Sequence, residues 1–360
     1  MVHLTYLERL DIFSNPGLAE FPLLKGMPWL KYLGLHYCQL ESTIPEWIGT
    51  LTKLETLALS NNFLTGTLPK SMSTMARLEK LYVDDNNLEG DIGFLGSIPS
   101  LRHVVVEDNM FTGGLSDELF LNLPLLEVFD ASKNPIDSTI PASLMALEKL
   151  RVLDCHSCNL HGSIPSFNDP NFQNTALEVL VLASNSLTGS IPEQISNYMG
   201  LRQLDLSKNQ LAFTIPSSLA NLQKLEYFYA ALNNFEPGEI PTFLYTMTNL
   251  KDLSLKATSR IGSIPEAIGS LSQLTMLDLD SNDLVSSIPT AIGKLTSLEY
   301  LLLNRNMLQG TLPPDLELLS KLGESLALSD NSYYGGLLCF TSLSLHNLTS
   351  ITPISPQISL

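Results

Sequence analysis

One apolar pattern recurs along most of this chain, and it restricts the chain to folds made by stacking copies of a single unit. The pattern reads Leu-x-x-Leu-x-Leu-x-x-Asn-x-Leu-x-Gly-x-Ile-Pro. Successive copies begin about 24 residues apart, a period typical of solenoids rather than of globular domains. The Asn position, or a Cys or Thr in its place, marks fourteen copies: Asn15, Cys38, Asn62, Asn86, Asn109, Asn134, Cys158, Asn185, Asn209, Asn233, Thr258, Asn282, Asn306 and Asn331.

Residues 201–222 show the structure that each copy predicts. Leucines alternate with polar residues over residues 201–207, which indicates a short strand with its leucines in the core and Gln203 and Asp205 facing water. Asn209 follows where the chain turns inward, and its amide can pair with backbone groups that a tight bend leaves unpaired. Residues 217–222 then return along the outside as a short helical or 3-10 turn.

A single coil of this kind cannot bury its apolar face, but stacked coils can. Strands about 4.8 Å apart would pair into one long parallel sheet and close a continuous core. We therefore predict an α/β repeat fold, with one solenoid domain of about fourteen units over residues 1–337. Residues 338–360 lose the period and are expected to form an irregular tail.

The second half of each copy carries a distinctive step of Ile-Pro or Leu-Pro, often preceded by Gly. Examples are Ile164-Pro165, Ile215-Pro216 and Leu312-Pro313, with glycines such as Gly162 and Gly310 before the step. This sequence pattern resembles the plant-type leucine-rich-repeat class, which includes receptor-like proteins, receptor-like kinases and polygalacturonase-inhibiting proteins. Related proteins also occur in diatoms and other stramenopiles. The resemblance implies a right-handed arc with a parallel concave β-sheet, short helical or 3-10 convex segments, and an extracellular or cell-surface location.

Both ends of the sequence depart from this class. Members normally begin with a signal peptide and a Cys-containing cap, whereas Leu4, Leu7 and Leu10 are already in phase with the repeat. The C-terminal tail likewise offers no obvious polar cap, although a terminal coil needs one. A truncated gene product explains both features, and a genuine cytosolic protein with capless ends is the competing interpretation.

The charge of the chain limits its partners. Its 37 acidic and 20 basic residues give a formal net charge of −17. Such a surface repels nucleic acid and anionic lipid, so neither is expected as a partner. The sequence also contains no apolar run of about 18 residues that could span a bilayer. We therefore expect a protein or peptide ligand, and the charge favours a basic one.

Two cysteines in the segment Cys155-His156-Ser157-Cys158 raise the question of a metal or redox site. Cys155 occupies a core leucine position and Cys158 occupies the Asn position, so both are expected in the core, where Cys acts as a small hydrophobe. His156 points to the other face, and no second Cys pair completes a zinc ligand set. We expect buried, reduced cysteines, and keep a zinc or redox site as the alternative.

Catalytic motifs are not evident in the sequence. The six histidines lack a serine elbow, a His-Glu-x-x-His helix or a suitable Cys partner. Carboxylates are abundant, but on a repeat surface they mostly occupy solvated strand positions. We therefore expect no enzyme activity and no cofactor.

The water-facing strand positions form the candidate ligand site. Read coil by coil, they place an acidic band across four consecutive coils and a pair of tyrosines farther along. The candidate residues are Tyr82, Asp84, Asp85, Glu107, Asp108, Asp130, Asp154, His156, Tyr227 and Tyr229. Tyrosine on a rigid concave sheet buries a large area at small entropic cost. The alternative is that these are ordinary variable positions of a repeat surface.

Two classes of function remain open from the sequence. One is a non-catalytic, receptor-like module that binds a protein or peptide along the concave wall. The other is a structural or inhibitory extracellular protein similar to polygalacturonase inhibitors. A membrane helix or kinase domain after the true gene end would favour the first, and a short cap without an anchor would favour the second.

Overall fold

The computed structural model describes residues 4–166, 172–323 and 325–334. Contacts between residues divide the chain into two compact units, Met1–Glu236 (unit 1) and Pro237–Leu360 (unit 2). Each unit repeats the same coil of a strand, an inward turn and a short outer segment. The prediction of one continuous domain to residue 337 stays a prediction, and the predicted tail, residues 338–360, lies outside the described residues.

Unit 1 contains a long parallel sheet in which each coil adds one strand. In chain order its strands are β1 (Arg9–Asp11), β2 (Tyr32–Gly34), β3 (Thr56–Ala58), β5 (Lys80–Tyr82), β7 (His103–Val105), β9 (Val128–Asp130), β10 (Val152–Asp154), β12 (Val179–Val181), β14 (Gln203–Asp205) and β16 (Tyr227–Tyr229). Two smaller parallel sheets follow the turns: β4 (Thr65–Gly66), β6 (Asn87–Asp91) and β8 (Met110–Thr112), then β11 (His161–Ser163), β13 (Ser186–Gly189) and β15 (Gln210–Leu211).

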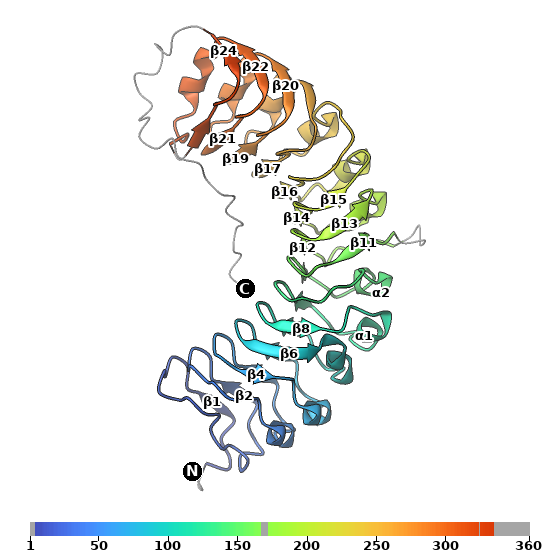
Figure 1. The fold of residues 1–360 in the computed structure, drawn as a ribbon, viewed down its shortest axis with the longest axis vertical. Coiled ribbons are helices and arrows are strands. Elements are labelled where there is room, and N and C mark those ends of the chain that lie inside the picture. The colour runs from blue at the N-terminus through green and yellow to red at the C-terminus, as the bar shows by residue number, and fades with distance from the viewer. Residues whose placement is uncertain (1–3, 167–171, 324, 335–360) are drawn as a thin grey trace. The chain divides into compact units, whose positions relative to one another are not determined.

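Short helical segments return the chain along the opposite side of unit 1. They are η1 (Glu46–Thr50), η2 (Lys70–Thr74), η3 (Ile92–Ser97), α1 (Asp117–Leu121), α2 (Ala142–Met145), η4 (Glu193–Asn197) and η5 (Ser217–Asn221), where η denotes a 3-10 helix. In Figure 1, α1 and α2 lie on one side of unit 1 and β12, β14 and β16 lie on the other. We call the exposed side of the long sheet, away from the core, the inner face of unit 1.

Unit 2 is built in the same way. Its main sheet contains β17 (Asp252–Ser254), β19 (Met276–Asp278), β21 (Tyr300–Leu302) and β23 (Ser325–Ala327), and its second sheet contains β18 (Ile261–Ser263), β20 (Asp283–Ser286), β22 (Met307–Gly310) and β24 (Ser332–Tyr333). The 3-10 segments are η6 (Thr242–Thr246), η7 (Glu266–Ser270), η8 (Thr290–Lys294) and η9 (Pro314–Leu318). The parallel strands and the short outer segments confirm the predicted repeat fold.

The repeated asparagines hold neighbouring coils together, as the sequence predicts. The Asn209 Nδ2 group donates to the carbonyl oxygens of Leu182, Leu206 and Ser207 at 2.9–3.2 Å. Its Oδ1 atom accepts from the Leu187 backbone N–H at 3.0 Å. One amide therefore pairs backbone groups of two coils, and Asn62, Asn86, Asn109, Asn134, Asn185, Asn233, Asn282, Asn306 and Asn331 make the equivalent bonds.

The cysteines at issue are buried, as expected from the repeat phase. Cys155 and Cys158 have no solvent exposure, and neither is in a disulfide. The Cys158 thiol donates to the Ala131 carbonyl oxygen at 3.1 Å, which replaces part of the Asn network. Contact with Cys158 and burial raise the pKa of the Cys155 thiol well above its ordinary value. Both side chains thus belong to the core.

We expect an alkylating reagent to label Cys155 and Cys158 only after the protein unfolds, because the thiolate is the reactive form and neither thiol is accessible. Peptide mapping by mass spectrometry, with iodoacetamide added before and after guanidinium, would check this and would report Cys339 separately. Rapid labelling of either residue in native protein would contradict the burial and restore the redox interpretation.

Candidate functional site

The strand register aligns the inner-face residues of unit 1 in rows across the coils. At the last strand position, Tyr82, Val105, Asp130 and Asp154 are neighbours in turn. The row continues through Val181, Asp205 and Tyr229. This register places Asp130 and Asp154 on adjacent strands, whereas Asp84, Asp85, Glu107 and Asp108 follow the ends of β5 and β7. It does not test whether these residues bind a ligand.

Asp130 and Asp154 face each other directly on β9 and β10. The Asp130 Oδ1 atom accepts from the Ser132 backbone N–H at 3.0 Å and from the Ser132 hydroxyl at 2.7 Å. The Asp154 Oδ1 atom lies 2.8 Å from Nδ1 of His156. Burial, together with the charge of Asp154, raises the pKa of Asp130 to about 7. Near neutral pH the pair therefore holds a proton that an isolated pair of carboxylates would have released.

His156 forms part of this arrangement rather than of a cysteine site. Its hydrogen bond to Asp154 raises the pKa of the His156 imidazole, against the effect of burial. Within the part of the chain that the structure describes, no three His, Cys, Asp or Glu side chains are arranged to hold a metal ion. The histidine therefore pairs with the acidic row rather than with the cysteines.

Asp84 and Glu107 are less open than the sequence suggests. The Asp84 carboxylate accepts a hydrogen bond from the Ser60 hydroxyl at 2.5 Å, and burial raises its pKa. Glu107 forms an ion pair with Lys133, with 2.7 Å between Oε1 and Nζ. Both side chains are half-buried rather than fully exposed, and each has a hydrogen-bond or ion-pair partner on a neighbouring coil.

Asp85 and Asp108 are the exposed members of the acidic band. Both occupy the turn position before the buried Asn and have a positive φ, 52° and 51° respectively. Lys133 and Lys208 occupy the same turn position with a φ of 53°. The turn therefore tolerates acidic and basic residues alike, which makes Asp85 and Asp108 suitable for charge reversal.

The three candidate tyrosines differ in setting. The Tyr82 hydroxyl lies 3.1 Å from Nδ1 of His103 on the next strand. Tyr227 is opposite Gln203 and Tyr229 is opposite Asp205. Tyr229 is only 8% exposed, so Tyr227 and Tyr82 present more aromatic surface on the inner face.

Gln203 and Asp205 are site residues that the sequence analysis left out of its candidates. Gln203 was expected to face water, yet it is 6% exposed, and its Oε1 atom has no hydrogen-bond partner among the described residues. Asp205 is half-buried, and its Oδ1 atom accepts from the Ser207 backbone N–H and hydroxyl at 2.9 and 2.6 Å. Aligning the copies by strand position would have placed Asp205 in the row of Asp130 and Asp154.

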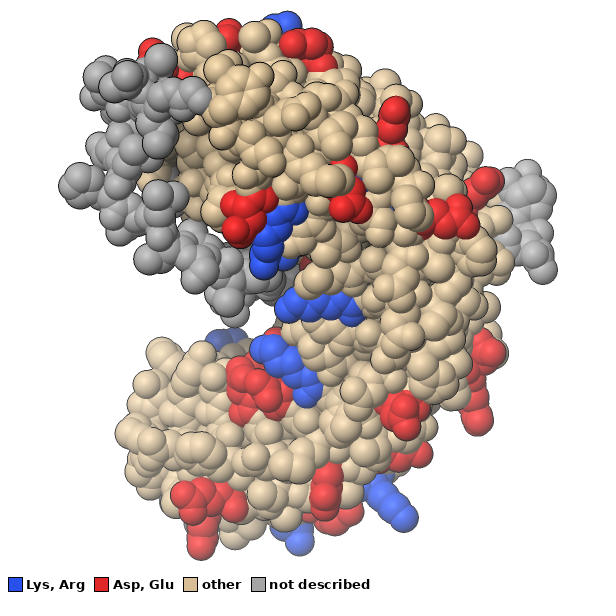
Figure 2. Space-filling model, turned by 45° about the horizontal axis from the view of Figure 1, so that its top comes forward, with Lys and Arg blue, Asp and Glu red and all other residues tan. Residues whose placement is uncertain are grey.

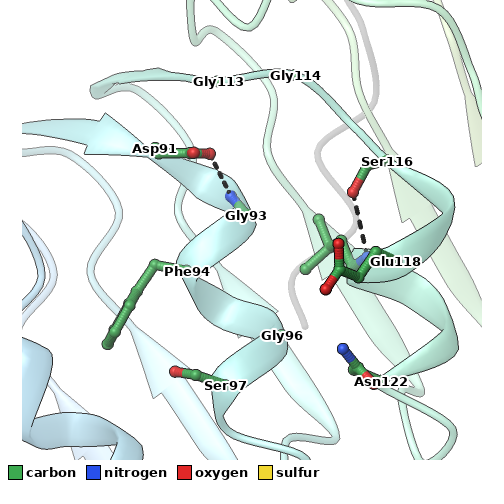
Figure 3. Close-up of a pocket in the computed structure, with 11 residues that line it drawn as sticks. Asp91, Gly93, Phe94, Gly96, Ser97, Gly113, Gly114, Ser116, Glu118 and Asn122 are labelled. Carbon is green, nitrogen blue, oxygen red and sulfur yellow. Dashed lines mark hydrogen bonds between the residues drawn. The ribbon is translucent and has the colours of Figure 1, made fainter.

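A separate cavity of about 410 Å³ lies between η3 and α1. It occurs where two successive coils lack the proline of the repeat and carry Gly93 and Ser116 instead. Figure 3 shows that the two polar groups at its upper edge are already engaged: Asp91 accepts from the Gly93 N–H, and Ser116 accepts from the Leu119 N–H. Ser97, Glu118 and Asn122 also line this cavity, but the inner face, where the register aligns side chains from many strands, is the candidate site that we follow.

On the face that Figure 2 displays, acidic side chains are dispersed over the surface, and several Lys and Arg side chains lie close together near its centre. No helix in the described ranges is long and apolar enough to cross a membrane.

Comparisons with known proteins agree with the geometry. Family models described as leucine rich repeat match residues 28–88, 149–169, 176–198, 200–222, 273–295 and 297–319. The chain is 36% identical over 245 residues to Receptor-like protein 35 of Arabidopsis thaliana, and the aligned region covers 67% of this chain and 23% of that protein. It is 33% identical over 254 residues to Receptor-like protein 32 of the same plant, and this alignment covers 70% of this chain and 23% of that protein. The chain thus spans about a quarter of the length of these relatives.

Solved structures give the same result. The plant peptide hormone receptor RGFR1, in complex with RGF2, has a TM-score of 0.74 and 31% identity over 87% of this chain and 54% of that chain. A leucine-rich-repeat protein of Leptospira interrogans has a TM-score of 0.73 and 28% identity, and the match covers 92% of this chain and 86% of that chain. The coil geometry of this chain is therefore similar to that of a plant peptide hormone receptor and of a bacterial repeat protein.

Proposed function

Because this chain is a leucine-rich-repeat protein with repeats of the plant type, we propose that it is a non-catalytic, receptor-like module that binds an extended peptide along the inner face of unit 1. A sheet of short parallel strands offers a rigid surface whose outward side chains can contact a ligand one coil at a time. The finding that carries the proposal is the register, which lines up carboxylates and tyrosines from successive strands on one face.

The similar receptors support a peptide as the ligand. RGFR1 was solved in complex with RGF2, and HAESA, with 26% identity and a TM-score of 0.73, in complex with the peptide hormone IDA. The acidic character of the inner face favours a basic segment in such a peptide, since carboxylates on adjacent strands repel one another until a cation arrives. No observation specifically favours the inhibitory alternative.

The proposal can be tested by selecting dodecamer peptides from a random phage-displayed library on the full chain. Selected peptides should be basic, and their association should slow as salt rises, because exposed charges are screened over about 8 Å at physiological ionic strength. Changing Asp85 and Asp108 together to Lys should slow association by roughly tenfold while the fold is kept, since lysine already occupies this turn elsewhere. Surface plasmon resonance would measure the rates.

A matched control reverses two exposed charges away from the inner face. Glu89→Lys with Asp137→Lys changes the net charge by the same amount on the segments that follow the turns. This control should leave association within about twofold of wild type. Equal slowing by both double variants would show a non-specific charge effect, and equal binding by wild type and the inner-face variant would contradict the proposed surface.

A further inference from the structure

The first coil of unit 1 contains a small cluster that shows how this scaffold holds a guanidinium group. On β1, Arg9 and Asp11 point to the inner face two residues apart, and Tyr32 lies opposite Arg9 on β2. The Arg9 Nη2 atom is 2.7 Å from Oδ2 of Asp11. The Arg9 Cζ atom lies 3.5 Å from the centroid of the Tyr32 ring. The guanidinium is thus held by a carboxylate and by an aromatic face.

The carboxylate and the aromatic position of this cluster recur at β14 and β16, where Tyr229 rather than a glycine lies opposite the carboxylate. Asp205 takes the place of Asp11, and Tyr227 takes the place of Tyr32 in the same register. Gln203 stands at the position of Arg9. The carboxylate and the aromatic ring are kept, but the cation that joins them in the first coil is replaced by a shorter, neutral side chain.

Among the described residues, the surroundings of Asp205 include His156, whose charge opposes the rise in the pKa of the Asp205 carboxyl, but they include no paired guanidinium. Arg202, next to Gln203 in the chain, forms an ion pair with Glu226. In the described part of the chain, no Lys or Arg pairs with Asp205, and the Oε1 atom of Gln203 lacks a hydrogen-bond donor. Burial, opposed by the hydrogen bonds from Ser207, raises the pKa of the Asp205 carboxyl. A buried amide oxygen beside a half-buried carboxylate favours a ligand rich in N–H donors.

We propose that Gln203, Asp205 and Tyr227 form a subsite for one arginine side chain of the ligand, which takes the role that Arg9 has in the first coil. A planar guanidinium can donate to the Asp205 carboxylate and to the Gln203 amide oxygen, which turns toward it, while stacking on the Tyr227 ring. This inference rests on the proposed peptide-binding function and adds the side chain that the peptide presents at β14.

The test uses the full chain and two small probes of the same shape. N-acetyl-arginine amide carries the guanidinium, and N-acetyl-citrulline amide replaces it with a neutral urea group. Titrations followed by saturation-transfer NMR should show that the arginine probe binds about tenfold more tightly than the citrulline probe, since a hydrogen-bonded charge is worth roughly this factor.

Two variants locate the binding. Asp205→Asn removes the charge but can still accept the hydrogen bonds from Ser207, and Gln203→Arg supplies a tethered guanidinium like that of Arg9. Each variant should bind the arginine probe about tenfold more weakly than wild type does. Asp11→Asn is the matched control in the coil that already holds its own arginine, and it should change the affinity by less than about twofold.

The inference is overturned if citrulline binds as well as arginine, if both variants keep wild-type affinity, or if Asp11→Asn weakens binding as much as Asp205→Asn. If Gln203→Arg does not fold, Asp205→Asn decides alone. Peptides that bind the inner face but are insensitive to Asp205→Asn would refute the subsite and leave the proposed function standing. Arginine binding at Asp205, with no peptide selected by the chain, would refute the function and keep the subsite.

Discussion

At pH 8, replacing Asp130 with Asn is expected to make the protein more stable. Burial and the opposed Asp154 raise the pKa of Asp130 to about 7, so the folded state holds a proton that the unfolded chain gives up near pH 4. Wild-type stability should therefore fall as pH rises from about 4 to about 7. The shift would correspond to about 4 kcal/mol in a dry site, and solvent access reduces this to roughly 2 kcal/mol.

The asparagine keeps the local hydrogen bonds, because its Oδ1 atom can still accept from the Ser132 backbone N–H and hydroxyl. Urea unfolding at pH 5, 6, 7 and 8 would measure the effect, with the variant showing a flatter pH profile than wild type. Asp137→Asn is the control, since that side chain is 79% exposed and should leave the profile unchanged. If the stability of the variant depended on pH as steeply as that of wild type, the raised pKa of Asp130 would be contradicted.

A gain in stability on removing the Asp130 carboxylate would also be relevant to the proposed peptide binding. Natural proteins often keep destabilising groups where activity needs them. Retention of opposed carboxylates on adjacent strands is understandable if a cationic ligand relieves their repulsion in the bound state. The stability of Asp130→Asn and its affinity for selected basic peptides should then change in opposite directions.

Replacing Asn209 with Ala should destabilise the protein by about 3 kcal/mol, because it leaves buried backbone groups of two coils unpaired. The Leu187 N–H loses its acceptor, and the carbonyl oxygens of Leu182 and Leu206 lose a donor. Urea unfolding followed by circular dichroism would give the change in the free energy of unfolding.

Asn15→Ala provides the comparison for this prediction. Asn15 occupies the same repeat position but is exposed, and it donates only to the carbonyl oxygens of Ile12 and Phe13. Its loss should cost less than about 1 kcal/mol, since water can replace it. Similar losses for the two variants would show that burial of the Asn network is not what makes it stabilising.

The sequence by itself determined the coil. The spacing of leucines set which side chains enter the core, and the Asn position marked each inward turn, because alternation along a strand and the demands of a tight bend are local properties. It also placed Asp130 beside Asp154 and Tyr227 beside Gln203, since copies of equal period stack in register. The core positions of Cys155 and Cys158 followed from the same phase.

Only the tertiary structure decided what each inner-face side chain experiences. The pairing of Glu107 with Lys133, the cover over Asp84 and the burial of Gln203 depend on side chains from neighbouring coils, about 24 residues away in sequence. Proton affinity is set by that burial and by nearby charges, so the sequence could not show that Asp130 and Asp84 differ from ordinary surface carboxylates. The likeness of the β14 cluster to the Arg9 cluster became visible only when distances joined Arg9 to both Asp11 and Tyr32.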